Sequence, residues 1–445
     1  MGEYNILKFG AIGDGKVNDT SAIQDAIDSC NKAGGGRVIV PAGYTFLSGT
    51  LKMRSNVEFH VERGAVLFAS PDPNDFSQVT PHDRRIALFV AEENTDNIAF
   101  TGGGIIDGSG RHYVESKTPA IYRMMRRRPY TFFLIGCSNV TYRDITIRDG
   151  AVWTIRLTGC RDVVITGVRI LNDLMVPNSD AIDLDHCQNV RISDCHIESG
   201  DDCIVLKTYE GYEQYGPCEN ITVVGCTMIS ASFAINLGCE VKNPIRNIVV
   251  DSCVIRNSHR GVGIHLSEES NIENVIFSNL IIETRYYDPA WWGAAEPIYI
   301  SAAPWTEEDE VGCVRNIRFV NIMCKSENGV FVYGWNQGII EDILFENVRI
   351  VLDKWTDEPG GRHDIRPIPG EKDGLKEGVY DYPTAGFYLK DASNVTLRNC
   401  EVIWGENRPE YFRYALESHS VENLILYNFI GDAAYPDKNE ATFIE

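Results

Sequence analysis

A short repeat constrains this chain more than any other feature of its sequence. Asn or Asp is followed by an aliphatic residue, alternating apolar positions and a second short apolar run. This pattern begins at Asn56, Asn97, Asn139, Asp162, Asn189, Asn220, Asn247, Asn274, Asn316, Asp342, Asn394 and Asn423. Between Asp162 and Asn274 the steps are 27, 31, 27 and 27 residues. Each step holds short β-branched runs separated by turn residues, and helical periodicity is absent.

A repeat of this length that is built from short strands corresponds to one coil of a parallel β-solenoid. A leucine-rich repeat would fit the step, but its Leu-x-x-Leu-x-Leu signature is missing. The sequence therefore predicts an all-β, right-handed parallel β-helix over residues 1–445 as a single domain. The alternative is a β-sandwich in which Asn merely marks the turns. In a solenoid we expect these Asn and Asp residues to adopt the left-handed conformation and to bond neighbouring backbone.

The ends and the irregular steps of the solenoid are also predicted. Residues 19–32 form an amphipathic pattern with Ile23 and Ile27 on one face, after an Asp19/Thr20 cap, and predict a short N-terminal helix that covers the first coil. Insertions on a rigid scaffold usually build the walls of a cleft. Three longer steps predict such loop excursions at residues 107–132, 285–313 and 353–385.

Composition narrows the classes of function. The chain carries 41 Lys and Arg against 63 Asp and Glu, a net charge of −22, which disfavours general binding to nucleic acids or anionic membranes. No apolar run approaches the ~18 residues of a membrane span. The 13 cysteines lack CxxC or zinc-ligand spacing and are expected to be buried thiols, with no metal. Without a recognisable leader the expected location is cytoplasmic, or secreted if a signal had been removed.

Three carboxylates are predicted to converge. The short strands beginning at Ser179, Asp201, Ser232 and Gly261 align with one another as SDAIDL, DDCIVL, SFAINL and GVGIHL. The alignment places Asp180 and Asp202 in one column on adjacent coils, roughly 5 Å apart, with Asp201 immediately before Asp202. Like charges this close favour one protonated and one ionised carboxyl, which glycosidic bond cleavage requires. The alternative is that the aspartates cap turns or bind an adventitious cation.

A second, mostly polar column is predicted on the same face. In the aligned strands it comprises Arg156, Asp183, Val205, Asn236, His265 and Tyr299. Such a column on an otherwise apolar strand pattern indicates a face that meets ligand or solvent. Lys207 follows the acid pair and could offset its charge, and aromatic residues near Trp292 could stack on sugar rings.

At these residues the sequence resembles glycoside hydrolase family 28, the polygalacturonase family. The segments FGAIGDGKVNDTSAIQDAID, GGGRVIVPAG and GGGIIDGSG look like the family's, and Asn-x-Asp at 178–180 together with Gly-Asp-Asp at 200–202 is specific. The resemblance implies a right-handed parallel β-helix. It also implies that Asp201 is the general acid, while Asp180 and Asp202 position and deprotonate the attacking water with inversion at the anomeric carbon.

The sequence departs from the family at two motifs. The family's Gly-His-Gly aligns with residues 231–233 (Ala-Ser-Phe) and its Arg-Ile-Lys with residues 263–265 (Gly-Ile-His), so the cations that would hold a galacturonate carboxylate are replaced. Either loop arginines at 126–128, 362 and 366 supply those contacts, or the sugar beside the scissile bond is not galacturonate. The predicted substrate-binding residues are Asn178, Asp183, Lys207, Asn236, Arg260, His265, Tyr299, Arg156 and Trp292.

The sequence thus predicts an inverting glycoside hydrolase for a plant or microbial oligo- or polysaccharide. A pectin-related substrate, such as a galacturonan or rhamnogalacturonan fragment, is favoured, and bulky loops around the cleft favour exo action. We expect no cofactor, and no nucleic-acid or membrane partner; the oligomeric state stays open. The alternatives are a β-helix lyase, an intramolecular glycosyltransferase and a non-catalytic glycan-binding solenoid.

Overall fold

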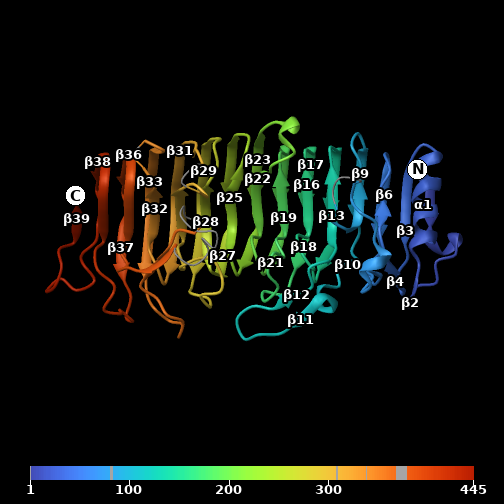
Figure 1. The fold of residues 1–445 in the computed structure, drawn as a ribbon, viewed down its shortest axis with the longest axis horizontal. Helices are drawn as coiled ribbons and strands as arrows, with labels where there is room; N and C mark the ends of the chain where they lie inside the picture. The colour runs from blue at the N-terminus through green and yellow to red at the C-terminus, as the bar shows by residue number, and fades with distance from the viewer. Residues whose placement is uncertain (1, 81–83, 307–308, 337, 367–377) are drawn as a thin grey trace. The chain divides into compact units, whose positions relative to one another are not determined.

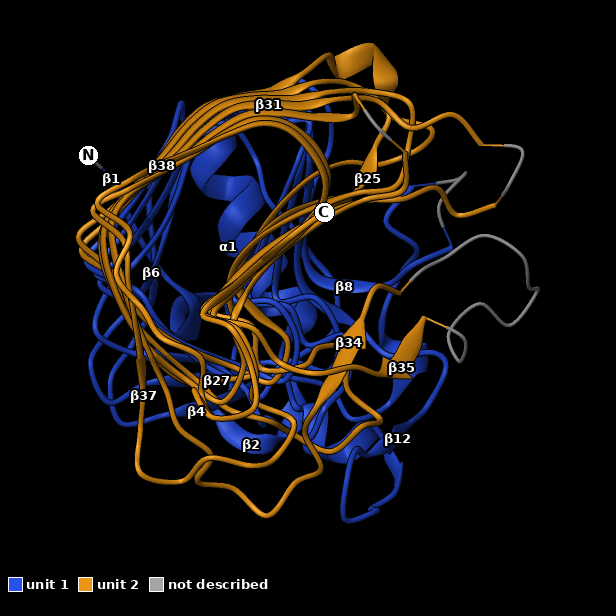
Figure 2. Ribbon diagram, turned by 90° about the vertical axis from the view of Figure 1, so that its left-hand side faces the viewer, with its two compact units in different colours: residues 1–204 blue, residues 205–445 orange. Residues whose placement is uncertain are grey.

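The structure is a computed structural model that describes residues 2–80, 84–306, 309–336, 338–366 and 378–445. The chain divides into two compact units, unit 1 (residues 1–204) and unit 2 (residues 205–445), which are coloured separately in Figure 2. Both units consist almost wholly of short strands that pair in parallel, as Figure 1 shows. The predicted all-β parallel β-helix is therefore confirmed. That all 445 residues form a single domain stays a prediction.

Unit 1 contains the single α-helix of the described chain and most of the short strands. Its helices are η1 (Ile6–Phe9), α1 (Thr20–Lys32), η2 (Pro73–Asp75) and η3 (Gly110–Tyr113). Its strands are β1 (Gly2–Asn5), β2 (Asp14–Asn18), β3 (Gly36–Val40), β4 (Thr45–Ser48), β5 (Leu51–Lys52), β6 (Val57–Val61), β7 (Val66–Ala69), β8 (Ala87–Ala91), β9 (Asp96–Thr101), β10 (Ile105–Asp107), β11 (Val114–Ser116), β12 (Arg123–Met124), β13 (Tyr130–Ile135), β14 (Ser138–Arg143), β15 (Thr146–Arg148), β16 (Ile155–Thr158), β17 (Arg161–Thr166), β18 (Arg169–Leu171), β19 (Ile182–Asp185), β20 (Gln188–Ser193) and β21 (His196–Ser199).

Strands in unit 2 are longer on average. They follow β22 (Ile204–Thr208), which starts at the last residue of unit 1, and a short helix η4 (Glu213–Tyr215). They are β23 (Cys218–Val224), β24 (Thr227–Ser230), β25 (Phe233–Val241), β26 (Ile245–Asp251), β27 (Val254–Ser258), β28 (Arg260–Leu266), β29 (Ile272–Thr284), β30 (Ile298–Ala302), β31 (Val314–Ser326), β32 (Val330–Gly334), β33 (Ile340–Leu352), β34 (Arg362–Asp364), β35 (Val379–Asp381), β36 (Phe387–Arg398), β37 (Glu401–Trp404), β38 (Leu416–Tyr427) and β39 (Thr442–Ile444).

In-register stacking of apolar side chains forms the core of each unit. In unit 1, β13, β16 and β19 are successive rungs, and Phe132 pairs with Ile155, which pairs with Ile182. In unit 2, β29, β31 and β33 are successive rungs. The rings of their phenylalanines at 277, 319 and 345 stack with centroids 5.1 and 5.0 Å apart. Each coil thus buries its apolar positions against the same positions of the next coil.

The repeated Asn and Asp residues hold the corners of the coils. All twelve adopt the left-handed conformation, with φ between 51° and 62°, as predicted. Where they bond along the ladder, however, side chain meets side chain and not backbone: Asn274 donates to Asn247 (3.3 Å) and accepts from Asn316 (2.6 Å). Short amides at equivalent corners of stacked coils are close enough to bond one another.

Helix α1 forms where it was predicted, and in Figure 1 it lies beside β3 and β6 at the N-terminal end of unit 1. It buries Ile23, Ala26, Ile27 and Cys30 against these strands. Asp19 occupies the N-cap position, as predicted, but its side chain makes no cap hydrogen bond. The Asp19 carboxylate instead accepts from the N–H groups of residues 12 and 13 (2.7 and 3.1 Å). These bonds tie the preceding loop to the helix.

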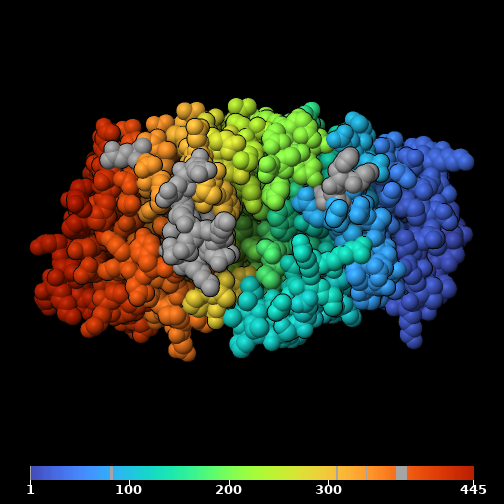
Figure 3. Space-filling model, viewed as in Figure 1, coloured from blue at the N-terminus to red at the C-terminus, as the bar shows by residue number. Residues whose placement is uncertain are grey.

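The three predicted excursions contain different structures. Residues 107–132 include an antiparallel pair, β11 with β12, that stands on the surface of unit 1 (Figure 3). Residues 285–313 include β30, a coil strand that pairs with β28. Residues 353–385 include the antiparallel pair of β34 and β35, which Figure 2 shows apart from the stacked rungs of unit 2, while residues 367–377 lie outside the described part.

The thirteen cysteines are thiols, of which Cys239 and Cys313 are partly exposed and the others are buried. No helix in the described part of the chain is long and apolar enough to span a membrane.

Candidate active site

Three aspartates meet at the N-terminal ends of two neighbouring rungs. Asp180 lies two residues before β19, and Asp201 and Asp202 form the turn before β22. One carboxylate oxygen of each lies within 4.8 Å of the other two. The backbone sets this placement: the N–H groups of residues 181 and 182 donate to the carbonyls of residues 202 and 203 (2.9 and 3.0 Å). Asp180 and Asp202 therefore face each other across adjacent coils.

The turns that carry the aspartates are tied together by small polar side chains. Ser179 Oγ donates to the Val176 carbonyl (2.8 Å) and accepts from Gly200 N–H (3.1 Å). Ser199 Oγ and Asn172 Nδ2 both donate to the Ser179 carbonyl (2.7 and 2.8 Å). A side chain at Gly200 would collide with the Val176 carbonyl, so only glycine lets the two turns pack this closely.

Asp201 differs from its two neighbours in exposure and in bonding. Asp180 and Asp202 are buried, with 3% and 5% of their surface exposed, whereas Asp201 is partly exposed. The N–H groups of Asn178 and Asp202 donate to the two oxygens of Asp201 (3.0 and 3.1 Å). The Asp201 carboxyl is thus held in one orientation and stays within reach of solvent.

The same cluster has the chemistry of a cation site. Among the described residues, these aspartates form the group of acidic side chains whose oxygens come close enough to share an ion. Carboxylate oxygens suit hard cations such as Ca²⁺. Aspartates are also commonly close together without any ion, so the cluster by itself does not assign a metal.

One of the loop arginines at 126–128 approaches the aspartates. Arg128 Nη2 donates to the Pro177 carbonyl (3.2 Å) and to Asn178 Oδ1 (3.4 Å). Burial lowers the pKa of the Arg128 guanidinium, and the negative charges of Asp180 and Asp201 partly oppose that effect. The arginine therefore lies within electrostatic range of the acids.

The polar column predicted along this face is fully enclosed in unit 1. Arg156 and Asp183 pair in register on β16 and β19, and both have 0% of their surface exposed. The guanidinium of Arg156 lies 3.2 Å from Asp185 and covers the rings of Phe133 and Trp153 at 4.5 and 4.8 Å. These contacts are internal. Substrate binding by Arg156 and Asp183 stays a prediction.

In unit 2 the column differs from the predicted alignment. Asn236 pairs with Gly263, which pairs with Tyr299, whereas His265 pairs with Gly238 two positions further on. The predicted register for His265 is therefore wrong. The ring of Phe233 occupies the space beside Gly263, where any side chain would collide with it, so the two strands pair with glycine at the polar position.

Two predicted substrate-binding residues are buried in unit 2. His265 has 3% of its surface exposed and Tyr299 has none, and their rings lie edge to face at 6.0 Å. Burial, reinforced by the charge of Arg260, lowers the pKa of His265 to about 3, so its ring is neutral near pH 7. Partly exposed Trp292 lies 6.5 Å from the same ring. Lys207 is buried against Glu240 at 3.5 Å.

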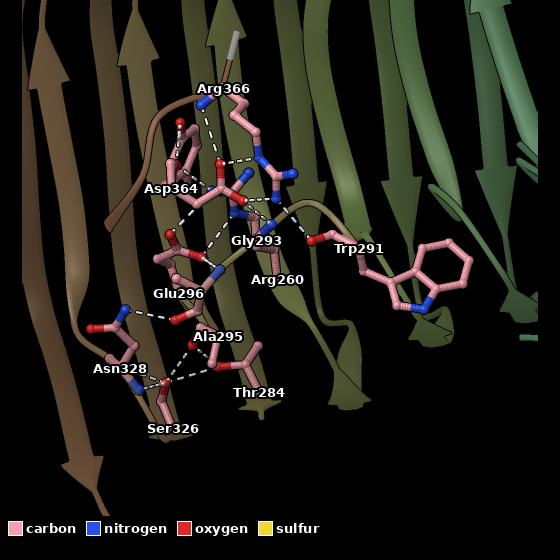
Figure 4. Close-up of polar contacts among 12 residues, drawn as sticks. Arg260, Thr284, Trp291, Gly293, Ala295, Glu296, Ser326, Asn328, Asp364 and Arg366 are labelled. Carbon is pink, nitrogen blue, oxygen red and sulfur yellow. Dashed lines mark hydrogen bonds and ion pairs between the residues drawn. The ribbon is translucent and has the colours of Figure 1, made fainter. Parts of the chain in front are cut away.

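Arg260 is the centre of a buried ion-pair network, drawn in Figure 4. Its side chain has 0% exposed surface and forms a bidentate pair with Glu296 (2.8 and 3.1 Å). It also donates to the Asp364 carbonyl (2.7 Å) and covers the ring of Tyr299 at 3.9 Å. The positive charge of Arg260 is therefore neutralised inside the protein.

Asp364 connects two loop segments of unit 2, as Figure 4 shows. Its carboxylate accepts from Arg366 (2.6 and 2.9 Å) and from Gly293 N–H (2.5 Å), and Arg366 also donates to the Trp291 carbonyl (2.9 Å). Burial alone would raise the pKa of Asp364, but the arginines at 366 and 260 hold it well below its usual range. Sequence reasoning missed Asp364 and Glu296; the alternating charges of Arg362-His363-Asp364-Ile365-Arg366 were the available signal.

A family assignment follows from comparison with known proteins. The sequence model of glycosyl hydrolases family 28 matches residues 30–356, most of the chain. The chain belongs to glycosyl hydrolases family 28. A probable polygalacturonase of Vitis vinifera is 31% identical over 257 residues, which cover 53% of this chain and 51% of that protein. The family 28 chain therefore aligns with about half the length of such curated relatives.

Solved structures share its fold. The alignment with an exopolygalacturonase of Yersinia enterocolitica spans 95% of this chain and 78% of that protein, with a TM-score of 0.73 and 19% identity. The alignment with a hyperthermoactive exopolygalacturonase of Thermotoga maritima spans 96% of this chain and 92% of that protein, with a TM-score of 0.65 and 22% identity. These likenesses confirm the predicted fold class, a right-handed parallel β-helix.

Proposed function

We propose that this family 28 chain hydrolyses glycosidic bonds in a pectin-related oligo- or polysaccharide, with Asp180, Asp201 and Asp202 as its catalytic centre. One observation carries the proposal: three carboxylates lie within 4.8 Å of one another at the ends of adjacent rungs. Carboxylates this close share protons, so one can act as acid while another acts as base.

The exposure of the three aspartates suggests their roles. Asp201 is the partly exposed member and protonates the leaving glycosidic oxygen as the bond from the anomeric carbon breaks. Asp180 and Asp202 face each other, bind a water between them and take its proton as the water oxygen bonds the anomeric carbon. The proton lost by the acid is replaced by the one taken from water.

We propose inversion at the anomeric carbon, which rests on the family resemblance. The carboxylate oxygens are closer than the roughly 6.5–9.5 Å of most inverting glycosidases. That spacing describes two carboxyl groups on opposite faces of the sugar. In a three-carboxylate centre two acids can hold the water beside the third. The configuration of the anomeric carbon in the product distinguishes inversion from retention.

The substrate is proposed to be a galacturonan or rhamnogalacturonan fragment that is cleaved from its end. The names of the two similar solved proteins support exo action, because both are exopolygalacturonases. Arg260 and Arg366 are already paired with Glu296 and Asp364. A substrate carboxylate would therefore have to meet other cations.

Replacing the acid tests the mechanism. Asp201→Asn removes the donated proton and is expected to lower kcat by at least about 1,000-fold without changing the melting temperature. Asp194→Asn is the matched control: it makes the same change at an exposed corner of unit 1 that already has the left-handed conformation asparagine favours. Near-normal turnover by Asp201→Asn would refute the assignment.

Product analysis separates the proposal from its alternatives. Pectic and neutral oligosaccharides are incubated with the protein, and products are read by mass spectrometry and anomeric NMR. Hydrolysis adds one water to the products with an inverted anomer, and a chelator leaves the rate unchanged. A lyase would give an unsaturated product that absorbs in the ultraviolet. An intramolecular glycosyltransferase would give a product to which no water has been added. Binding of the oligosaccharide without any product would indicate a glycan-binding solenoid.

A further inference from the structure

Arg128 is held in a way that its immediate neighbours do not explain. Its Nη1 atom is buried and has no hydrogen-bond partner among the described residues. Burying a donor without a partner costs free energy, so each such group calls for an explanation. Other arginines of the 107–132 excursion have surface partners: Arg123 pairs with Glu115, and Arg127 donates to Asn74.

The contacts of Arg128 lead to the proposed acid through one peptide group. Its Nη2 atom donates to the carbonyl oxygen of Pro177 (3.2 Å). The same peptide group carries the N–H of Asn178, which donates to Asp201 Oδ2 (3.0 Å). The oxygen end of this amide thus meets a guanidinium and its hydrogen end meets a carboxylate, and each contact polarises the amide in the sense that strengthens the other.

A second contact fixes the rotation of that peptide group. Asn178 has the left-handed conformation, with φ of 54°, and its Oδ1 atom accepts from Arg128 Nη2 (3.4 Å). The guanidinium therefore holds the side chain and the preceding carbonyl of one residue together. Turning the peptide away from Asp201 would break both contacts.

The fold anchors the arginine itself. Buried Pro129 follows it and restricts the backbone, and Tyr130 N–H donates to the Ile86 carbonyl (2.9 Å) at the start of β13. The side chain then extends from this rung to the turn before β19. A guanidinium keeps its charge even when partly buried, so the contact is permanently cationic.

We propose that Arg128 is a positioning residue for the general acid: it fixes the Pro177–Asn178 peptide so that its N–H orients the Asp201 carboxyl toward the leaving oxygen. The inference rests on the proposed role of Asp201. It assigns Arg128 to the chemical step and not to binding of a substrate carboxylate, which makes the two roles separable by kinetics.

Kinetics of three variants test the role. Arg128→Gln is expected to lower kcat about 100-fold, since misplacing a reacting group by about 1 Å has that effect, while KM changes less than about 3-fold. Arg128→Lys keeps the charge and should recover part of kcat. Arg191→Gln removes an exposed arginine of β20 and should behave as wild type. A crystal structure of Arg128→Gln should show the bond from Asn178 N–H to Asp201 broken.

Other outcomes overturn the inference. A rise in KM for polygalacturonate but not for its methyl ester, with kcat unchanged, would make Arg128 a substrate-binding residue. A fall in kcat with the Asn178–Asp201 bond intact would also refute it, as would wild-type kinetics. If Arg128→Gln does not fold, Arg128→Lys is judged by the same criteria. Failure of the proposed function is distinguishable, because wild type would then not hydrolyse substrate or Asp201→Asn would remain active.

Discussion

Buried ionisable side chains of this protein are either ionised or neutral, and the groups around each residue determine which. Asp364 and Arg260 stay charged because each has a partner of opposite sign and further hydrogen bonds. Buried His363 has no such partner among the residues that the structure describes and is surrounded by rings: Tyr382 stacks on it at 4.3 Å, and Tyr388 and Phe331 meet it edge to face. Pairing keeps one class of residue ionised, and aromatic burial keeps the other neutral.

The burial of His363 predicts an acid-sensitive stability. Burial, aided by nearby His419, lowers the pKa of His363 to about 3, against about 6.5 in the unfolded chain. Because the unfolded state binds the extra proton, the contribution of His363 to the free energy of unfolding should be constant above about pH 6.5 and fall by up to about 1.4 kcal/mol per pH unit below it, down to about pH 3.

Urea unfolding of wild type and His363→Phe at about pH 7, 5.5 and 4.5 measures this effect. The phenylalanine keeps the ring contacts and cannot bind a proton, so its pH slope should be smaller by about one proton. His265 remains in both proteins and contributes equally. Identical slopes would show that His363 does not titrate between the folded and unfolded states.

Neighbouring rungs are joined at the scale of elements by the asparagine ladder. At Asn274, between β26 and β31, one side chain satisfies two structural demands. It adopts φ of 58°, and its amide bonds Asn247 on one side and Asn316 on the other. The conformation and the hydrogen bonds therefore make separate contributions that two substitutions can distinguish.

Asn274→Ala is expected to lower the free energy of unfolding by about 2 kcal/mol, because alanine is strained at positive φ and cannot bond the ladder. Asn274→Gly accepts the conformation and loses only the ladder bonds, so its loss should be about 1 kcal/mol. Urea unfolding and hydrogen exchange in β26, β29 and β31 measure the difference. Equal losses for the two variants would mean that the left-handed conformation is not a source of strain.

Net charge is the property of the whole molecule that bears on the proposed pectic substrate. A chain with a charge of −22 repels a polyuronate over a distance that salt controls. The described arginines of the Arg260 and Arg366 network are internally paired and do not offset this field locally. Binding of an acidic polymer should therefore become tighter as ionic strength rises, whereas binding through ordinary ion pairs becomes weaker.

Raising NaCl from about 10 to 200 mM is expected to lower KM for polygalacturonate several-fold, since the screening length falls from about 30 to below 10 Å. The fully methyl-esterified polymer has the same backbone without charge and should show a KM that is nearly independent of salt. Initial-rate kinetics at constant pH measure both. A KM for polygalacturonate that rises with salt would show that local cation contacts outweigh the net charge.

The sequence by itself determined the repeat, the β-helix and the convergence of Asp180, Asp201 and Asp202. These follow from a short period and from strand alternation, which act between residues of one coil and the next. Only the tertiary structure decided the rest. The register that pairs His265 with Gly238 places Gly263 beside the ring of Phe233. The pairing of Arg260 with Glu296 and Asp364 joins segments whose separation in sequence carries no periodic signal. Hydrogen bonds between distant loops depend on the positions of the polar atoms at the ends of side chains. A repeat fixes only the positions of the backbone atoms from which those side chains extend.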